Sequence, residues 1–467
     1  MNRTVALKKF TLTRCYNTTV SRYYVENFGC RATQADGAAI ERELAQNGLD
    51  RASAASDAEV VVLNTCTVTA SADQDARAAI RRIHRQNPDC KILVTGCYAQ
   101  RAPQELAGMP GVTWVVGNSH KMRVADIALQ STSRASSAFV PLSGLTGASA
   151  GMLVGDIFAH TELMAAPVFD ADISSERTRP NLKVQDGCDN RCSFCVIPYV
   201  RGQSRSLNLD RVLQEVNALV ALGYREVVIS GINLGRWGRD FTPAARFEDL
   251  VRAILTGTSL ERLRLSSIEP MDWSEELIQL VATSPRIAKH AHVPMQSGSD
   301  RILRAMHRKY RPWHYRDRVQ RIREAIPNAA IGADVMVGFP GETDDDFAHT
   351  RRMIEDLPFT YLHVFTYSAR PATPAASLPD QVPVHIARDR NRILRDIAAA
   401  KKLAFQRSFL GKTIEAITLS VFDGEFTEAL TDNYLKLRLS GHHPANQWLR
   451  ARVLDVRGGT LIGSLSN

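Results

Sequence analysis

Short apolar runs recur along most of the chain, each followed by a polar turn and then by a stretch with helical periodicity. This alternation predicts an α/β protein in which parallel strands are joined by crossover helices. One series of runs predicts a doubly wound parallel sheet and covers residues 23–28, 60–63, 92–94 and 112–116. A second series predicts a partial (β/α)6 barrel of the TIM type and covers residues 182–185, 227–230, 263–266, 291–294, 334–337 and 362–365.

The last part of the chain changes character. Residues 414–421, 429–439 and 449–456 alternate or run apolar between Gly and Asn turns, which is typical of a small antiparallel barrel. A length of 467 residues suggests about three domains. We therefore expect an N-terminal extension (1–22), a sheet domain (23–126), a linker or irregular connection rich in small residues (127–176), the central barrel (177–410) and a C-terminal barrel (411–467).

Three cysteines follow the first strand of the central barrel directly, at Cys188, Cys192 and Cys195. Thiolates are the usual ligands of iron-sulfur clusters, and four of them normally complete a cubane. The C-x3-C-x2-C spacing therefore predicts a cluster with one iron open for chemistry. An incomplete structural zinc site is the alternative. Such a site would need a further ligand, and the nearest histidines, His160 and His290, are far away in the sequence.

Cys30, Cys66 and Cys97 each lie just beyond an apolar run of the sheet domain. Because the carboxyl ends of parallel strands form one edge of a sheet, the three thiols should converge there and hold a second cluster, again with one open iron. The alternative is that three cysteines stand at strand ends by coincidence and bind nothing. Cys15 and Cys90 lack this placement and are given no role.

Polar residues also follow the strands of the central barrel. Enzymes with this fold build their sites at the carboxyl ends of the strands. We predict that a cofactor is bound there by Asn233, Glu269, Gln296, Ser297 and Gly338.

Positive charge is concentrated in two stretches of a chain with a net charge of +9. Residues 301–324 hold nine Lys or Arg against two acids, with aromatics interleaved, and residues 388–412 hold eight against two. Such clusters collect phosphates, and exposed aromatics stack on unpaired bases, although solvated helix faces can look the same. We predict RNA contacts at Arg301, Arg304, Arg308, Lys309 and Arg311.

Composition limits the compartment. No apolar run approaches the roughly 18 residues that a membrane span needs, and eight cysteines with no secretory signal argue for a reducing, cytoplasmic setting. Five basic residues and no acid within the first 22 are open to two interpretations, a transit peptide or a ragged start. We expect no membrane and no DNA among the partners.

With these residues in place, the chain resembles the methylthiotransferase family of radical S-adenosylmethionine (SAM) enzymes from about Tyr23 onward. The resemblance rests on FGCRATQADG, NTCTVT, TGCYAQ and KVQDGCDNRCSFCVIPYVRG. The pieces LSSIEP, HVPMQSGSDRILRAMHRKY, DVMVGFPGETDDDF and HVFTYSARPATPAA are similar to the branch that modifies threonylcarbamoyladenosine at position 37 of tRNA. LTDNYLKLRL resembles the TRAM domain of the family, which contacts tRNA.

The resemblance implies a division of labour between two four-iron four-sulfur clusters. Cys188, Cys192 and Cys195 would hold the cluster that cleaves SAM to an adenosyl radical, and the other three cysteines an auxiliary cluster that carries the sulfur. The radical would take hydrogen from adenine carbon 2 in the anticodon loop, and a second SAM would supply the methyl group. An external electron donor and a sulfur source are implied, and Arg201 would contact SAM or substrate.

The chain departs from the family pattern after its first cysteine. Thr33 and Asp36 stand where the family usually has Asn and Glu, which would alter the surroundings of the auxiliary cluster but not its thiol ligands. Three alternatives stay open: an isopentenyladenosine tRNA methylthiotransferase, an enzyme that modifies an aspartate of a ribosomal protein, and a non-catalytic iron-sulfur RNA-binding protein.

Overall fold

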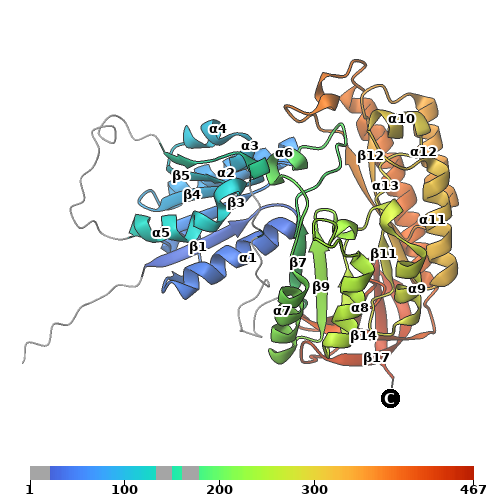
Figure 1. Ribbon diagram of the computed structural model, residues 1–467. Coiled ribbons are helices and arrows are strands. Elements are labelled where there is room, and N and C mark those ends of the chain that lie inside the picture. The colour runs from blue at the N-terminus through green and yellow to red at the C-terminus, as the bar shows by residue number, and fades with distance from the viewer. Residues whose placement is uncertain (1–20, 133–149, 160–162, 164–177, 467) are drawn as a thin grey trace, which may run out of the picture.

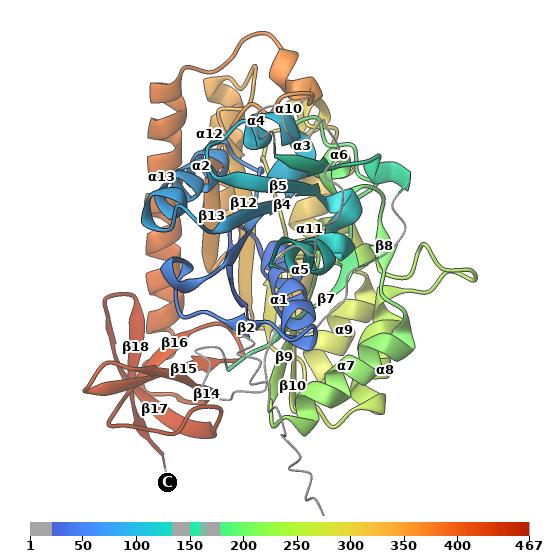
Figure 2. The same ribbon diagram turned by 90° about the vertical axis from the view of Figure 1, so that its left-hand side faces the viewer.

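A computed structural model describes residues 21–132, 150–159, 163 and 178–466 of the chain (Figure 1). Nearly all of the predicted N-terminal extension, with Cys15, and most of the predicted linker therefore lie outside the described residues. Three bodies follow one another in the order that the sequence predicts: a sheet domain, a strand-helix barrel and a small β-barrel (Figures 1 and 2).

The first body is an all-parallel sheet with the strand order β2-β1-β3-β4-β5-β6. Its strands are β1 Arg22–Asn27, β2 Asp50–Arg51, β3 Val60–Thr65, β4 Lys91–Gly96, β5 Val112–Gly117 and β6 Gly151–Leu153. Its helices are α1 Arg31–Gln46, α2 Ala70–Gln86, α3 Cys97–Arg101, α4 Pro103–Ala107 and α5 Val124–Thr132. Every residue of β3 is buried, because α1 and α5 cover one face of the sheet and α2 and α4 the other.

The doubly wound sheet is thus confirmed, with one difference. Strand β6 lies inside the segment that small residues predicted to be irregular, and it pairs with the edge strand β5 from Trp114 to Val116. So short a strand is held by backbone hydrogen bonds to the edge strand β5, and the residue composition of a segment does not reveal such bonds.

The second body contains six parallel strands, β7 Asn181–Asp186, β9 Glu226–Gly231, β10 Arg262–Leu265, β11 His290–His292, β12 Ala330–Val337 and β13 Tyr361–Thr366. They form two sheets joined by a bridge between Leu263 and Ile287, and the two-residue strand β8 Arg205–Ser206 pairs antiparallel with β7. The main helices are α6 Ile197–Arg201, α7 Leu209–Ala221, α8 Phe247–Gly257, α9 Glu275–Thr283, α10 Asp300–Ala305, α11 Pro312–Ala325, α12 Asp344–Asp356 and α13 Val384–Arg407.

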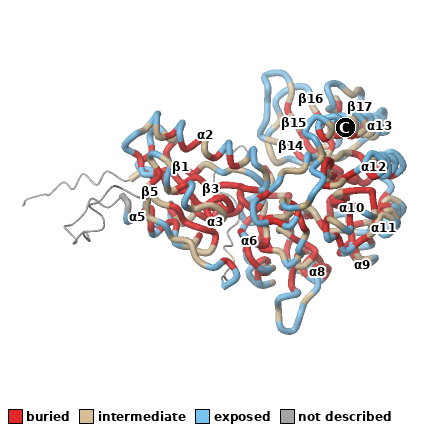
Figure 3. The backbone as a smooth tube through the Cα atoms, turned by 90° about the horizontal axis from the view of Figure 1, so that it is seen from above, coloured by how far each residue is buried: buried red, intermediate tan, exposed pale blue. Residues whose placement is uncertain are grey.

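Helices cover the outside of these strands, and one apolar core runs between the two layers (Figure 3). The predicted partial barrel is confirmed. Its first strand is packed against the sheet domain, since α1 lies on β7 and α3 lies on α6 (Figure 1).

The third body is a closed barrel of five strands, β14 Thr413–Phe422, β15 Phe426–Thr431, β16 Lys436–Ser440, β17 Trp448–Arg457 and β18 Thr460–Leu465. Figure 2 shows it below one end of α13. The expected single run over residues 429–439 is in fact two strands, separated by a turn in which Tyr434 takes a left-handed φ of 64°. The barrel is not purely antiparallel as predicted, because it closes through a parallel pair of β16 and β18.

Candidate metal centres

The loop after β7 holds Cys188, Cys192 and Cys195 at the carboxyl end of the first barrel strand. The Cys188 amide donates to Gly202 O at 3.0 Å, and the Cys195 amide donates to Cys192 O at 3.1 Å. Burial, followed by the neighbouring cysteine sulfurs among other groups, raises the pKa of Cys195 to about 12. Burial likewise raises the pKa of Cys188 to about 11. Burial thus disfavours the thiolate forms of Cys188 and Cys195, and a bound metal would favour them.

Two of the predicted cofactor contacts, Asn233 and Glu269, lie beside this loop. Asn233 donates from Nδ2 to Cys188 Sγ at 3.7 Å, and its buried Oδ1 has no hydrogen-bond partner among the described residues. Glu269 accepts from Arg308, whose other terminal nitrogen donates to Cys192 Sγ at 3.2 Å. Gln296 follows β11 with a left-handed φ of 62°.

The other two predicted contacts are used for packing. Ser297 is buried, and its hydroxyl lies 3.2 Å from that of Thr350 on α12. A Cβ on Gly338 would come within 2.6 Å of Ala387 on α13, so this glycine permits close approach of a helix. Neither contact supports the prediction that these two residues bind a cofactor.

At the edge of the sheet domain, Cys30 precedes α1, Cys66 follows β3 and Cys97 begins α3. A Cβ on Gly29, whose φ is +101°, would meet Cys66 Cβ at 2.5 Å, so only glycine lets the two cysteine loops pack this closely. Burial raises the pKa of Cys66 to about 12, and the sulfurs of Cys97 and Cys30 raise it further. The three cysteines thus lie at one edge of the sheet with their sulfurs near one another, and the cluster that they are predicted to hold stays a prediction.

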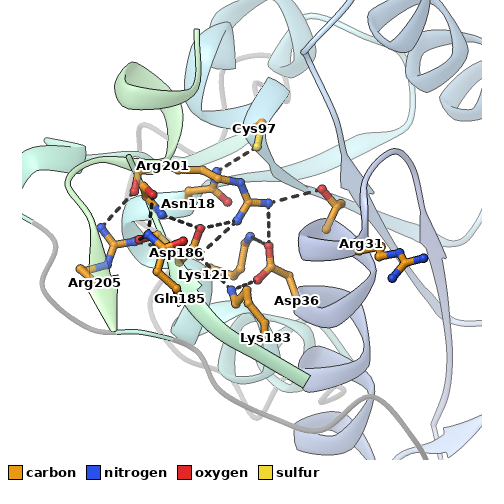
Figure 4. Close-up of polar contacts among 12 residues, drawn as sticks. Arg31, Asp36, Cys97, Asn118, Lys121, Lys183, Gln185, Asp186, Arg201 and Arg205 are labelled. Atoms are coloured by element: carbon orange, nitrogen blue, oxygen red, sulfur yellow. Dashed lines mark hydrogen bonds and ion pairs between the residues drawn. The ribbon is translucent and has the colours of Figure 1, made fainter. Parts of the chain in front are cut away.

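Asp36, Lys121, Lys183, Asp186 and Arg201 form a buried group of charges that we call the Asp36 network (Figure 4). Lys121 Nζ lies 2.6 Å from the Asp36 carboxylate, Arg201 lies 2.9 Å from it, and Lys183 also pairs with it. Asp186 accepts from Lys183 and from Arg201, each at 2.9 Å. Burial alone would raise the pKa of Asp36, but the three cations hold it well below its usual range.

The network spans two bodies of the fold. Asp36 and Lys121 belong to the sheet domain, whereas Lys183, Asp186 and Arg201 belong to the barrel. It therefore connects β7, which leads into the loop of Cys188, with α1, which begins directly after Cys30.

The sequence predicted that Arg201 contacts SAM or substrate, but its side chain is buried and already paired. Its guanidinium is engaged by Asp36 and Asp186, and it also donates to Thr33 Oγ1 at 3.3 Å. The Thr33 hydroxyl in turn lies 3.5 Å from Cys30 Sγ, and Asn118 Nδ2 donates to Cys97 Sγ at 3.5 Å. Arg201 thus supports the cysteines of the sheet domain, and the two residues that depart from the family pattern are its direct partners.

The predicted RNA contacts divide into two kinds. Arg308 is buried and donates to Cys192 Sγ, which does not support the prediction that it contacts RNA. Tyr310 and Tyr315, interleaved in the same stretch, are also buried and cannot stack on a base. The other predicted residues remain at least partly accessible on α10 and the turn after it: Arg301, Arg304, Lys309 and Arg311.

Comparisons with known proteins agree with this division into a sheet domain and a barrel. Residues 22–117 match a family described as "Uncharacterized protein family UPF0004", and residues 182–354 match the radical SAM superfamily. A solved structure, a radical SAM methyltransferase (TsrM) from Kitasatospora setae, superposes with a TM-score of 0.55 at 18% identity, covering 76% of this chain and 75% of that one. The fold is therefore that of a radical SAM enzyme. In the part of the chain that the structure describes, no helix is long and apolar enough to cross a membrane.

Similar proteins of known name show which family of radical SAM enzymes the chain belongs to. The chain is 36% identical to a threonylcarbamoyladenosine tRNA methylthiotransferase (MtaB) from Aquifex aeolicus, over 92% of this chain and 99% of the relative. It is 36% identical to a protein of the same name from Bacillus subtilis, over 88% and 89%. A tRNA-2-methylthio-N(6)-dimethylallyladenosine synthase from Acidothermus cellulolyticus is 33% identical over 94% and 84%. The chain belongs to the radical SAM methylthiotransferase family, whose cofactors are two four-iron four-sulfur clusters and SAM.

The two groups of three thiols fit these cofactors. Each supplies soft ligands for three irons and leaves one iron without a protein thiol. Sequence reasoning found all six cysteines, but it missed Lys121 and Lys183. The only local signal was a lysine within the apolar strand of residues 182–184.

Proposed function

We propose that this chain converts N6-threonylcarbamoyladenosine at position 37 of tRNA to its 2-methylthio derivative. The observation that carries the chemistry is the pair of incomplete thiol sets, one on the sheet domain and one on the barrel, joined through the buried Asp36 network. One set alone would suit radical generation or sulfur storage, whereas a methylthiolation needs both. The names of the relatives at 36% identity support the threonylcarbamoyl substrate.

The cysteines take the roles of cluster ligands. Cys188, Cys192 and Cys195 would hold the cluster that, with SAM bound at its open iron, supplies the adenosyl radical. Arg308 donates to Cys192 and pairs with Glu269, so it orients that sulfur and offsets its negative charge.

Cys30, Cys66 and Cys97 would hold the auxiliary cluster that carries the sulfur to be inserted. Thr33 and Asn118 lie at hydrogen-bonding distance from two of these sulfurs, and Arg201 stands behind them with its guanidinium fixed in place. Positive charge and hydrogen bonds at cluster sulfurs set the potential of a cluster, so these side chains would tune it.

The substrate would be an anticodon loop whose base 37 is splayed into the barrel. The accessible cations Arg301, Arg304, Lys309 and Arg311, with those of α13, would hold stem phosphates. The reaction uses two SAM, an external electron donor and a sulfur source. A cytoplasmic setting suits both the free thiols and the substrate.

Nucleoside mass spectrometry tests this proposal. Bulk tRNA would be compared from a host lacking its own methylthiotransferases, with and without the chain expressed. We expect a new 2-methylthio-threonylcarbamoyladenosine peak. A 2-methylthio-isopentenyladenosine peak would instead place the chain with the relatives named dimethylallyladenosine synthases. No new nucleoside, with both clusters present, would refute the tRNA reaction.

A further inference from the structure

The inner face of the barrel carries an unexpectedly polar wall on three adjacent strands. Ala291, Val293, Ala333 and Val335 are buried in the core beneath the outer helices. Side chains alternate along a strand, so the residues between them face the barrel interior. We call the polar side chains there, His292 of β11, Asp334 of β12, and Tyr361 and His363 of β13, the inner wall.

One buried nitrogen of the inner wall has no hydrogen-bond partner within the described chain. The possible ligand atoms of His292, Asp334 and His363 all lie within 4.8 Å of one another. His292 Nε2 lies 3.4 Å from Asp334 Oδ1, yet it is buried and makes no hydrogen bond within the described chain. A buried nitrogen left unpaired is costly, and a ligand with a hydrogen-bonding group here would pair with it.

A series of hydrogen bonds links the inner wall to the barrel cysteines. The amides of Met295 and Gln296, just after β11, donate to Asp334 O at 3.0 and 2.8 Å. Tyr310 donates to Met295 O at 2.8 Å and contacts Arg308, which reaches Cys192. The inner wall and the cysteine loop thus belong to the same barrel interior, where one substrate base could contact both.

A positive charge faces the same region from the sheet domain. Arg31 follows Cys30 directly but points away from the Asp36 network (Figure 4). It donates to the hydroxyl of Tyr434, from the C-terminal barrel, at 2.6 Å. The ring of Tyr434 lies 4.5 Å from that of His290, whose Nε2 is 2.7 Å from the hydroxyl of Tyr361 in the inner wall. Burial and then nearby positive charge, that of Arg31 included, lower the pKa of His363, which agrees with this placement. A guanidinium has five N–H donors, and most of them remain available for a ligand.

We propose that Arg31, His292, Asp334 and His363 form a subsite for the polar N6 substituent of the base. The proposal rests on the threonylcarbamoyl substrate proposed above. That substituent offers a urea, a hydroxyl and a carboxylate: Arg31 pairs with the carboxylate, while the two imidazoles and Asp334 bond the hydroxyl and the urea. An isopentenyl group is a hydrocarbon and would cover these polar groups without offering them a hydrogen bond. The subsite therefore selects between the two kinds of modified tRNA.

Binding measurements on the holoenzyme with SAM test this subsite without depending on turnover. The probes are anticodon stem-loops with threonylcarbamoyladenosine, isopentenyladenosine or plain adenosine at position 37, followed by fluorescence anisotropy. The variants are His363→Phe and Arg31→Met, and the matched control is His349→Phe, an exposed histidine on the outer helix α12. Iron content and the visible spectrum confirm that the clusters remain.

We expect His363→Phe to weaken binding of the threonylcarbamoyl stem-loop about tenfold, which is the loss of one good hydrogen bond. Binding of the adenosine stem-loop should not change. Arg31→Met should weaken binding at least as much, and a probe lacking the carboxylate should bind Arg31→Met and the wild type equally. His349→Phe should match the wild type throughout.

The outcomes separate this inference from the proposed function. If the wild type prefers the threonylcarbamoyl stem-loop and neither variant changes that preference, the subsite is wrong while the function stands. If the wild type prefers the isopentenyl stem-loop, the proposed substrate itself is wrong. Two histidines and a carboxylate can also hold a divalent metal. Stoichiometric zinc that is lost in His363→Phe, without an effect on RNA binding, would overturn the subsite in favour of a metal site.

Discussion

Asp36→Asn is the sharpest test of how the two bodies that carry the cysteines are held together. The substitution keeps the size of the side chain and removes the charge that Lys121, Lys183 and Arg201 share. The three cations would then surround a neutral amide with almost no access to water, because the Asp36 side chain is 0% exposed and that of Arg201 is 1% exposed.

The expected loss follows from these contacts. Removing one partner of a buried ion pair costs about 3–5 kcal/mol, since it leaves a charge uncompensated. Lys183 and Arg201 would keep Asp186, and Lys121 could release its proton, which places the loss near the lower end, at about 3 kcal/mol. Asp36→Glu keeps the charge and should lose less.

Urea unfolding of the anaerobic apoprotein, followed by circular dichroism, measures this loss. Because a chain of several domains need not unfold in one step, the transition that involves the sheet domain is the one to compare. Asp126→Asn is the matched control: its pair with Arg123 is more than half exposed and should contribute no more than about 1 kcal/mol. Equal losses for Asp36→Asn and Asp126→Asn would refute the reasoning.

The same residue makes a prediction about pH. The pKa of Asp36 is lowered in the folded protein, so its contribution to stability is present above the unfolded value of about 3.9 and is lost as the pH falls. The wild type should therefore lose more stability than Asp36→Asn when the pH is lowered from 7 toward 3. Parallel pH profiles for the two proteins would contradict this.

Three further predictions concern the cysteine loops. Cys192→Ala should abolish reductive cleavage of SAM, and normal deoxyadenosine production by this variant would rule out the ligand assignment. Cys66→Ala should still cleave SAM but insert no sulfur, a separation seen by quantifying deoxyadenosine and methylthionucleoside together. Arg308→Met removes a cation that contacts Cys192, so it should lower the reduction potential of the barrel cluster in an EPR-monitored titration; an unchanged potential would show that Arg308 has only a packing role.

Much of the fold was predictable because it depends on local patterns. The apolar run of residues 60–63, set among helical patterns, predicted a strand of a parallel sheet, and that is what β3 is. All six cysteines lie two or three residues beyond such runs or in a single tight loop, so their placement at the strand ends follows from strand direction alone. The short strand β6 and the division of residues 429–439 were not predictable, because edge pairing and barrel closure depend on distant partners.

What the sequence determined by itself is therefore the order of the domains, the two sets of thiols and, through its motifs, the family. Only the tertiary structure decided which charged residues are buried and which groups they pair with. Arg201 and Arg308 look like surface cations in the sequence, yet one is buried in the Asp36 network and the other lies against Cys192. The physical reason is that the spacing of apolar residues in a sequence indicates which hydrocarbon side chains are buried, but it says nothing about charged ones. A buried charge needs partners, and some of these lie far along the chain, as Asp36 does from Arg201 and Cys192 from Arg308, so no local pattern records them.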